Sequence, residues 1–169
     1  MTQTAQQSTV ADGSVAGSDD APAVDTVDPL ALEAQVCLAL SAAARALVGT
    51  YRTLLEPLGL THPQYLAMLA LWQDGPMSLV RLAARLHLEP ATTSPLVKRL
   101  EARGLVARRT DTRDERALVI ELTDAGAAMR EQAVGIPGAM LERLGLDAEE
   151  VAHVRDAALV VLDACERAD

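Results

Sequence analysis

The fold is decided by Met77–Thr123, which read MSLVRLAARLHLEPATTSPLVKRLEARGLVARRTDTRDERALVIELT. The first part predicts a short helix, because apolar residues recur at helical spacing, at Leu79, Leu82, Ala83 and Leu86. A second helical pattern follows a short break, with core positions at Leu96, Val97 and Leu100. This second helix should end at Gly104, since a glycine that follows basic residues is a common helix stop.

Two short segments after the second helix alternate apolar and polar residues, as β-strands do. They span 105–109 and 118–122 and are joined by the charged segment 110–117, which predicts a β-hairpin with a polar tip. A helix-turn-helix followed by a hairpin is a winged helix-turn-helix, and its common use is to read duplex DNA. The expected fold is therefore mainly α-helical with a small β-wing.

A long helical pattern precedes this unit, over about 29–58. Asp28 is the predicted N-cap, and apolar residues then repeat every three and four positions, as in a heptad seam. The seam has more apolar surface than one small DNA-binding unit can cover. We therefore expect it to pack against other long helices, some of them from a second subunit.

Further helices are predicted after the hairpin. Thr123 caps a helix over 124–133, residues 135–138 must bend or break it, and a last helix covers 147–167. That last helix carries an apolar stripe along one side. Helices from both ends of the chain that flank a DNA-reading unit indicate a dimerisation module, and hence a homodimer.

These patterns divide the chain into a tail and one domain. Residues 1–28 are small, polar and acidic, which predicts a disordered tail. The domain covers 29–169, with the DNA-reading unit at about 63–123 and dimerisation helices at about 29–58 and 124–167. The predicted architecture is a winged helix-turn-helix with N- and C-terminal dimerisation helices.

Charge is distributed unevenly along the chain. The net charge is −9, but residues 78–117 hold nine bases and five acids and are locally positive. A local basic face is what the phosphate backbone attracts, so double-stranded DNA is the expected partner.

Composition disfavours several other classes. No apolar run reaches the roughly 18–20 residues that span a membrane, and the N-terminus lacks the basic and apolar regions of a signal peptide. Two cysteines far apart in the chain, Cys37 and Cys165, indicate a reducing cytoplasm rather than a disulfide framework or a zinc site. We expect a cytoplasmic protein with no cofactor, metal or membrane partner, and not an enzyme.

The second helix of the motif should enter the major groove with its N-terminal half. When its core positions face inward, the outward residues are Ala91, Thr92, Ser94, Pro95, Lys98 and Arg99. The two hydroxyls can bond base edges or phosphates, the alanine and proline can contact thymine methyl groups, and the two cations are expected on phosphates. The alternative interpretation is a polar helix face exposed to solvent.

The predicted wing carries several arginines. Arg113 at the tip is the candidate for the minor groove, while Arg108 and Arg109 on the first strand lie within reach of phosphates. Arg116 is expected to pair with Asp114 and so to shape the hairpin, and it is also a candidate DNA contact.

Residues 114–126 carry a family pattern. They read Asp-Glu-Arg-Ala, four further residues, Leu-Thr, two further residues and Gly, which resembles the wing signature of the MarR family of bacterial transcriptional regulators. The resemblance extends over roughly 33–140 and is closest to the organic-hydroperoxide-responsive repressors of the OhrR type. The stretches that carry it are QVCLAL at 35–40, YRTLLEPLGLT at 51–61, PQYL at 63–66, LHL at 86–88, PLVKRLE at 95–101 and IPG at 136–138.

What the resemblance implies is a homodimeric repressor on a pseudo-palindromic operator, released when Cys37 is oxidised. Cys37 and Tyr51 stand where that subgroup has its sensor cysteine and a tyrosine partner. A thiolate attacks the peroxide O–O bond and becomes a sulfenic acid, which then condenses with another thiol. Tyr51 lies 14 residues along the same predicted helix, about 21 Å away. Its phenol can therefore reach the cysteine of a partner chain but not that of its own.

Two positions depart from the subgroup, which usually has tyrosine where this chain has Ser41 and His62. Ser41 is four residues after Cys37 and can donate a hydrogen bond within the chain, and His62 can donate from a ring nitrogen. Either substitution also fits altered or lost sensing, and Cys37 also fits a small apolar seam residue. A small thiol would complete the oxidation, with Cys165 as the weaker alternative.

Other functions stay open on the sequence. A MarR-type repressor can instead be released by a small aromatic ligand without redox chemistry, in a cleft lined by Tyr51, His62, Tyr65 and Trp72. A thiol peroxidase that uses Cys37 is disfavoured because no cysteine lies at C-x-x-C spacing. A module that binds only protein is disfavoured by the bases within 78–117.

Overall fold

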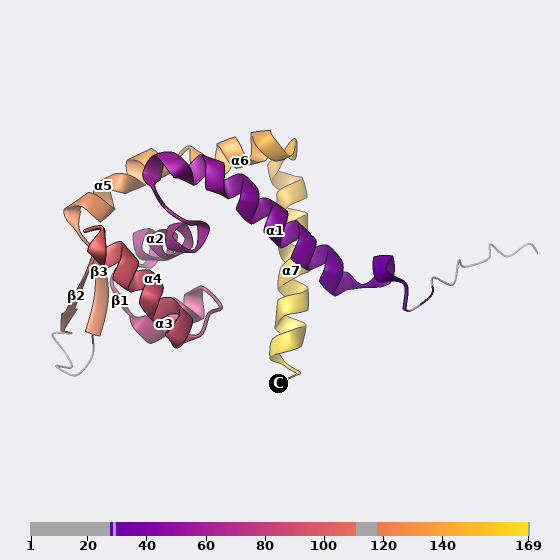
Figure 1. Cartoon of the computed structure of the whole chain (residues 1–169), viewed down its shortest axis with the longest axis horizontal. Coiled ribbons are helices and arrows are strands. Elements are labelled where there is room, and N and C mark those ends of the chain that lie inside the picture. The colour runs from indigo at the N-terminus through magenta and orange to yellow at the C-terminus, as the bar shows by residue number, and fades with distance from the viewer. Residues whose placement is uncertain (1–27, 29, 111–117, 169) are drawn as a thin grey trace, which may run out of the picture.

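The computed structural model describes residues 28, 30–110 and 118–168. These residues form a mainly helical molecule with a small antiparallel sheet, which confirms the predicted fold class (Figure 1). Most of the predicted acidic tail and the predicted wing tip lie outside the described residues. In the described part, no helix is long and apolar enough to span a bilayer.

The winged-helix lobe is the compact unit between 61 and 122. Its elements are α2 (His62–Asp74), β1 (Met77–Ser78), α3 (Leu79–Arg85), α4 (Pro90–Ala102), β2 (Val106–Thr110) and β3 (Leu118–Leu122). The strands are antiparallel in the order β1-β3-β2. The sequence does not predict β1, because a strand of two residues shows no alternation to recognise.

Short local signals start the three helices of the lobe. Ahead of α2, the backbone N–H of Thr61 donates to Gln64 Oε1 at 2.9 Å. At α3, Ser78 Oγ accepts from the backbone N–H of Arg81 at 3.2 Å. Pro90 opens α4, at a position where a helix has no use for a backbone N–H.

The flanking helices are α1 (Val36–Leu55), α5 (Asp124–Ala133), α6 (Ile136–Leu144) and α7 (Ala148–Glu166). Figure 1 shows α1 running diagonally from its N-terminus to the lobe, with α6 above it and α5 beyond its lobe end. The last helix, α7, descends from the far end of α6. The lobe is thus joined to the flanking helices through the end of α1 and through the start of α5.

The first long helix starts later than predicted. A short 3₁₀ helix covers Leu32–Ala34, and α1 begins at Val36 with Gln35, not Asp28, as its N-cap. Asp28 Oδ1 instead accepts from the backbone N–H of Leu30 at 2.9 Å. Leu30 is 89% exposed, so the single chain offers it no apolar contact that would stabilise a longer helix.

The bend predicted at 135–138 is narrower than expected: the chain turns at Val134 and Gly135, and α6, a helix that the sequence did not predict, begins at Ile136. Pro137 occupies the first turn of α6, where proline is tolerated. Gly145 ends α6 with a left-handed φ of 64°. Asp147 then caps α7, as its Oδ1 accepts from the backbone N–H groups of Glu149 and Glu150 at 2.8 and 2.9 Å.

The core lies inside the lobe and under the end of α1. Its fully buried apolar side chains include Leu55, Met68, Leu71, Leu82, Val97, Leu100 and Ile120. In contrast, α7 has no buried residue, and Val154 on its apolar stripe is 61% exposed. The N-terminal half of α1 is exposed in the same way. Two long helices therefore present uncovered apolar faces, which is typical of an interaction surface.

Candidate nucleic-acid interface and thiol site

The outward face of α4 holds the residues predicted to contact DNA. Exposed side chains stand at Ala91, Thr92, Pro95, Lys98 and Arg99, and Ser94 is half-buried. On the opposite face, the predicted core residues Leu96, Val97 and Leu100 are buried. A helix with one anchored face and one polar, cationic face can lie in a major groove. The individual contacts with DNA stay a prediction.

Thr93 does not belong to this outward face. Its side chain is 0% exposed, and its Oγ1 donates to the carbonyl oxygen of Glu89 at 3.1 Å. It thereby ties the first turn of α4 to the residue before the helix. Thr93 is not among the residues predicted to contact DNA. Its spacing of three and four residues from Leu96 and Val97 already places it on the buried stripe of α4.

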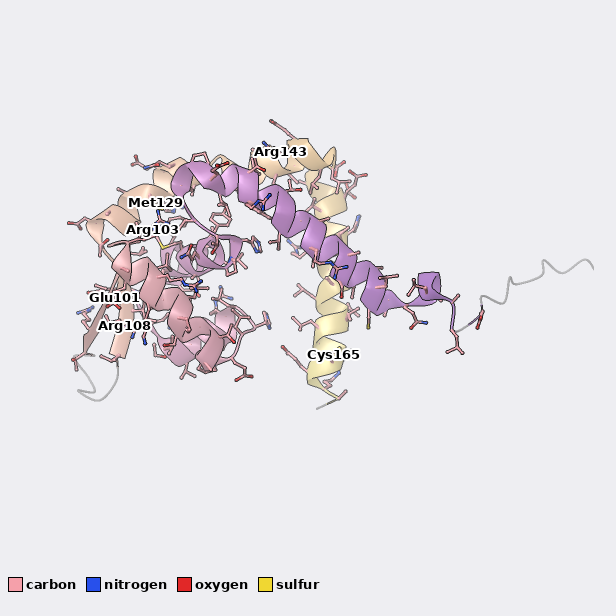
Figure 2. All side chains as sticks on the ribbon, viewed as in Figure 1. Glu101, Arg103, Arg108, Met129, Arg143 and Cys165 are labelled. Atoms are coloured by element: carbon pink, nitrogen blue, oxygen red, sulfur yellow. The ribbon has the colours of Figure 1, made fainter. Side chains whose placement is uncertain are left out.

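Arg108 turns toward α4 rather than outward. The hairpin register pairs Arg108 with buried Ile120, so both side chains lie on the inner face of the wing. Its Nε lies 3.4 Å from Glu101 Oε2, an ion-pair contact that lacks hydrogen-bond geometry. Figure 2 shows Glu101 and Arg108 next to each other at the wing. A phosphate contact by Arg108 stays a prediction, and it requires the guanidinium to leave Glu101.

The remaining wing arginines divide into two groups. Arg109 lies on the outer face, where its Nε contacts Glu121 Oε2 at 2.6 Å across the hairpin. Arg113, Arg116 and their expected partner Asp114 lie outside the described residues. The minor-groove contact and the ion pair at the wing tip are therefore still predictions.

Cys37 is the second residue of α1, and its side chain is exposed. Ser41, one turn further along the helix, is exposed as well. Tyr51 lies 14 residues from Cys37 on the same continuous helix, about 21 Å away. The single chain therefore does not bring Cys37 together with Tyr51, and any contact between them needs a second chain.

Tyr51 and His62 do meet each other. Their ring centroids are 4.8 Å apart, and the ring of Tyr65 lies 6.0 Å from that of Tyr51. Burial raises the pKa of Tyr51 and lowers the pKa of His62, and burial followed by the charge of Tyr51 raises the pKa of Tyr65. Tyr51 is thus a neutral phenol and His62 a neutral imidazole near pH 7. Both can donate a hydrogen bond without carrying charge.

A cavity of about 390 Å³ opens between α2, α5 and α6. Its wall is mostly apolar and aromatic with one cation, and it includes Tyr65, Leu69, Trp72, Arg130, Ala133 and Pro137. Tyr65 and Trp72 were expected to line a ligand cleft, whereas the other two residues of that expectation, Tyr51 and His62, are not among its lining residues. An apolar, aromatic wall with one cation fits a small anion that carries a flat, apolar ring.

Trp72 also joins the lobe to the flanking helices. Its Nε1 donates to the carbonyl oxygen of Gly126 at 2.9 Å, across 54 residues of chain. Gly126 lies in the first turn of α5, where Thr123 Oγ1 accepts from its backbone N–H at 3.1 Å. The start of α5 is therefore bound to α2 on one side and to the end of the wing on the other.

Comparison with known proteins identifies the family. Residues 60–118 match the model of the MarR family. The organic hydroperoxide resistance transcriptional regulator of Bacillus subtilis (strain 168) is 36% identical over 136 residues, which is 80% of this chain and 92% of that protein. The chain belongs to the MarR family. It is accordingly a DNA-binding transcriptional regulator, and MarR-family regulators act as dimers.

Solved structures of MarR-type regulators show the same architecture. Reduced AbfR bound to DNA, from Staphylococcus epidermidis, is 30% identical with a TM-score of 0.67, over 79% of this chain and 94% of that chain. Bordetella bronchiseptica BpsR, whose DNA binding is regulated by 6-hydroxynicotinic acid, is 28% identical with a TM-score of 0.69, over 84% and 100%. Both matches are longer than the family match at 60–118, so the likeness includes flanking helices.

Proposed function

We propose that this MarR-family regulator is a repressor that leaves its operator when an organic hydroperoxide oxidises Cys37. One observation carries the proposal: an exposed thiol at the start of α1, in a chain 36% identical to a regulator of organic hydroperoxide resistance. AbfR adds support, because its solved structures include overoxidised and disulfide-formed states.

The proposed chemistry is a two-electron oxidation of sulfur. The Cys37 thiolate attacks one peroxide oxygen, the O–O bond breaks, and the other oxygen leaves with a proton as the alcohol. Cys37 is now a sulfenic acid. A small thiol then attacks its sulfur, which forms a mixed disulfide and releases water.

Assembly of the dimer would complete the sensor. The helices α1 and α5–α7 would form the dimer and cover the apolar faces of α1 and α7, while residues 63–123 read DNA. Crossing of the two α1 helices would bring the partner's Tyr51 to Cys37, where its neutral phenol donates to the thiolate. Ser41 would donate from the next turn of the same helix, and His62 would hold the Tyr51 ring by packing against it.

Release from DNA would follow from bulk added inside this interface. Each α4 is proposed to lie in a major groove, with Lys98 and Arg99 on phosphates and Arg113 in the minor groove. A mixed disulfide at Cys37 would add bulk between the two crossed helices, and the helices would have to separate or rotate to accommodate it. The two lobes would then no longer match two half-sites of the operator.

The test is release of a DNA complex by cumene hydroperoxide, followed by fluorescence anisotropy. The duplex is selected in vitro from a random pool with the reduced wild type. Wild type and the matched control Cys165→Ser should release it after about one equivalent of peroxide in the presence of a small thiol, and Cys37→Ser should stay bound. Loss of peroxide should stop at that stoichiometry, which separates a sensor from a thiol peroxidase. Equal behaviour of Cys37→Ser and wild type would exclude the proposal.

A second candidate effector is a small aromatic acid in the cavity between α2, α5 and α6. The apolar wall with Arg130 at its edge favours it, as does the likeness to BpsR. Trp72 is the single tryptophan of the chain, so its fluorescence reports on this cavity without background. Salicylate should quench Trp72 and release DNA in wild type and in the control Arg143→Gln, but weakly in Arg130→Gln. Unchanged fluorescence at millimolar salicylate would rule this effector class out.

A further inference from the structure

We infer that Arg103 is a positioning residue that fixes α4 relative to α1, and that it thereby sets the spacing of half-sites that the dimer accepts. The inference uses DNA binding by a dimer and does not depend on the chemistry of Cys37. It concerns a residue that lies on neither the outward face of α4 nor the wing.

The guanidinium of Arg103 binds the end of α1. Arg103 is the C-cap of α4, and its Nη1 donates to the carbonyl oxygen of Gly59 at 2.5 Å. Its Nη2 donates to the carbonyl oxygen of Leu58 at 2.8 Å. Both carbonyls stand at the end of the 3₁₀ helix Glu56–Leu58, which continues α1 without a break. Figure 2 shows Arg103 beyond the end of α4, on the side of the lobe nearest α1.

The chain end of α1 is shaped to receive this arginine. Gly59 has a left-handed φ of 60°, which turns the backbone sharply after the 3₁₀ helix. A Cβ at Gly59 would lie 3.0 Å from Arg103 Nη2, so glycine also leaves the space that the guanidinium fills. The negative end of the α1 dipole adds attraction for a cation here.

The other end of the contact is rigid. Leu100, three residues before Arg103, is 0% exposed in the core, and the backbone N–H of Arg103 still bonds to the carbonyl oxygen of Arg99 at 3.3 Å. Leu55 and Leu58 anchor the α1 side in the same core. The planar guanidinium donates to two adjacent carbonyl oxygens, so it fixes the orientation of α4 relative to α1 as well as the distance between them. A lysine ammonium cannot do this. The position of α4 therefore follows that of α1.

This link matters because a dimer reads two half-sites about one helical turn, roughly 34–36 Å, apart. One additional base pair moves a half-site by about 3.4 Å along the axis and rotates it by about 35°. A lobe held on α1 by Arg103 cannot follow such a displacement. Without Arg103 the lobe is still held to α1 by the apolar packing of Leu55 and Leu58, but it loses the two hydrogen bonds that fix its orientation. Apolar packing is non-directional, so the lobe should turn further and tolerate the altered spacing.

The experiment compares two duplexes and four forms of the full-length protein under reducing conditions and at one salt concentration. One duplex is selected in vitro with the wild type, and the second carries one extra base pair between its half-sites. The forms are wild type, Arg103→Met, Arg103→Lys and the matched control Arg85→Met. Arg85 has the same charge, but its contact, Nε to Asp74 Oδ2 at 2.6 Å, lies inside the lobe.

Wild type and Arg85→Met should bind the longer duplex at least about tenfold more weakly than the selected one. For Arg103→Met the ratio of the two affinities, selected duplex over longer duplex, should fall to about threefold or less. The ratio for Arg103→Lys should fall as well, because the lysine ammonium cannot bond both carbonyls. A merely structural role of Arg103 would weaken both duplexes alike and keep the ratio, and that result would overturn the inference. Equal binding of both duplexes by wild type would overturn it too. If Arg103→Met does not fold, Arg103→Lys decides, since it keeps the charge at the helix end.

Discussion

Substitution of Gly126 by alanine should destabilise the protein strongly, whereas the same change at Gly138 should not. The α-carbon of Gly126 lies against the chain that enters the wing, and an added Cβ would stand 2.0 Å from the carbonyl oxygen of Leu105. That oxygen is backbone and also accepts from the backbone N–H of Thr123 at 3.1 Å. It cannot rotate away, so α5 itself must move by more than 1 Å to reach an ordinary contact of about 3.4 Å.

The size of the effect follows from what that shift breaks. Overpacking of a dense site costs about 1–3 kcal/mol. Displacement of α5 also weakens two hydrogen bonds of about 1 kcal/mol each, from Trp72 Nε1 to the Gly126 carbonyl and from the Gly126 N–H to Thr123 Oγ1. A loss of about 3 kcal/mol in the free energy of unfolding is expected. For a chain of this size, that lowers the melting temperature by about 6–12 °C.

The assay is thermal unfolding followed by circular dichroism, at one protein concentration because the stability of a dimer depends on it. Gly138→Ala is the matched control, since a Cβ at Gly138 in α6 meets nothing within 4 Å. It should leave the melting temperature unchanged or raise it, as alanine favours a helix by about 0.5–1 kcal/mol over glycine. A Gly126→Ala protein that melts within about 2 °C of wild type would refute the packing argument.

Three further predictions concern single side chains. Thr93→Val should lower the free energy of unfolding by about 1 kcal/mol in urea titrations, because it removes a buried hydrogen bond, while Thr93→Ser keeps the hydroxyl and should not lose that bond. Burial lowers the pKa of His62 below 6.5, so the unfolded chain takes up the proton first and stability should fall as the pH drops through 6.5. His62→Asn should flatten that part of the pH profile, and an unchanged profile would contradict the assignment. Each substitution is present in both subunits of the dimer, so Lys98→Gln and Arg99→Gln should each reduce the slope of log affinity against log salt by about 1.8, which is about 0.9 for each of two phosphates. A slope equal to that of wild type would remove the residue from the phosphate contacts.

Periodicity and turn residues were sufficient to predict the lobe except for β1. The apolar spacing at Leu96, Val97 and Leu100 gave the buried face of α4, and the alternation over 118–122 gave β3 with its observed bounds. These signals are local, because each depends on residues that repeat within one element. The same alternation, applied to Val106 and Arg108, would also have shown that Arg108 faces inward.

What the sequence could not predict depends on distant contacts or on a second chain. Arg103 reads as an ordinary cation near a helix end, and its partners lie 44 and 45 residues earlier in the chain. The late start of α1 reflects Leu30 and Leu32, which are 89% and 63% exposed in the single chain. The candidate thiol site also depends on a second chain, because Cys37 and Tyr51 are separated along one rigid helix and only a partner helix can bring them together.

Peptide mass spectrometry can show whether Cys37 is the residue that senses hydroperoxide. The reduced, full-length protein is treated with one equivalent of cumene hydroperoxide, trapped with a sulfenic-acid reagent and digested. We expect the trapped product on Cys37, with Cys165 still a free thiol, although both side chains are exposed. Equal labelling of the two cysteines, or an unmodified Cys37, would contradict this expectation.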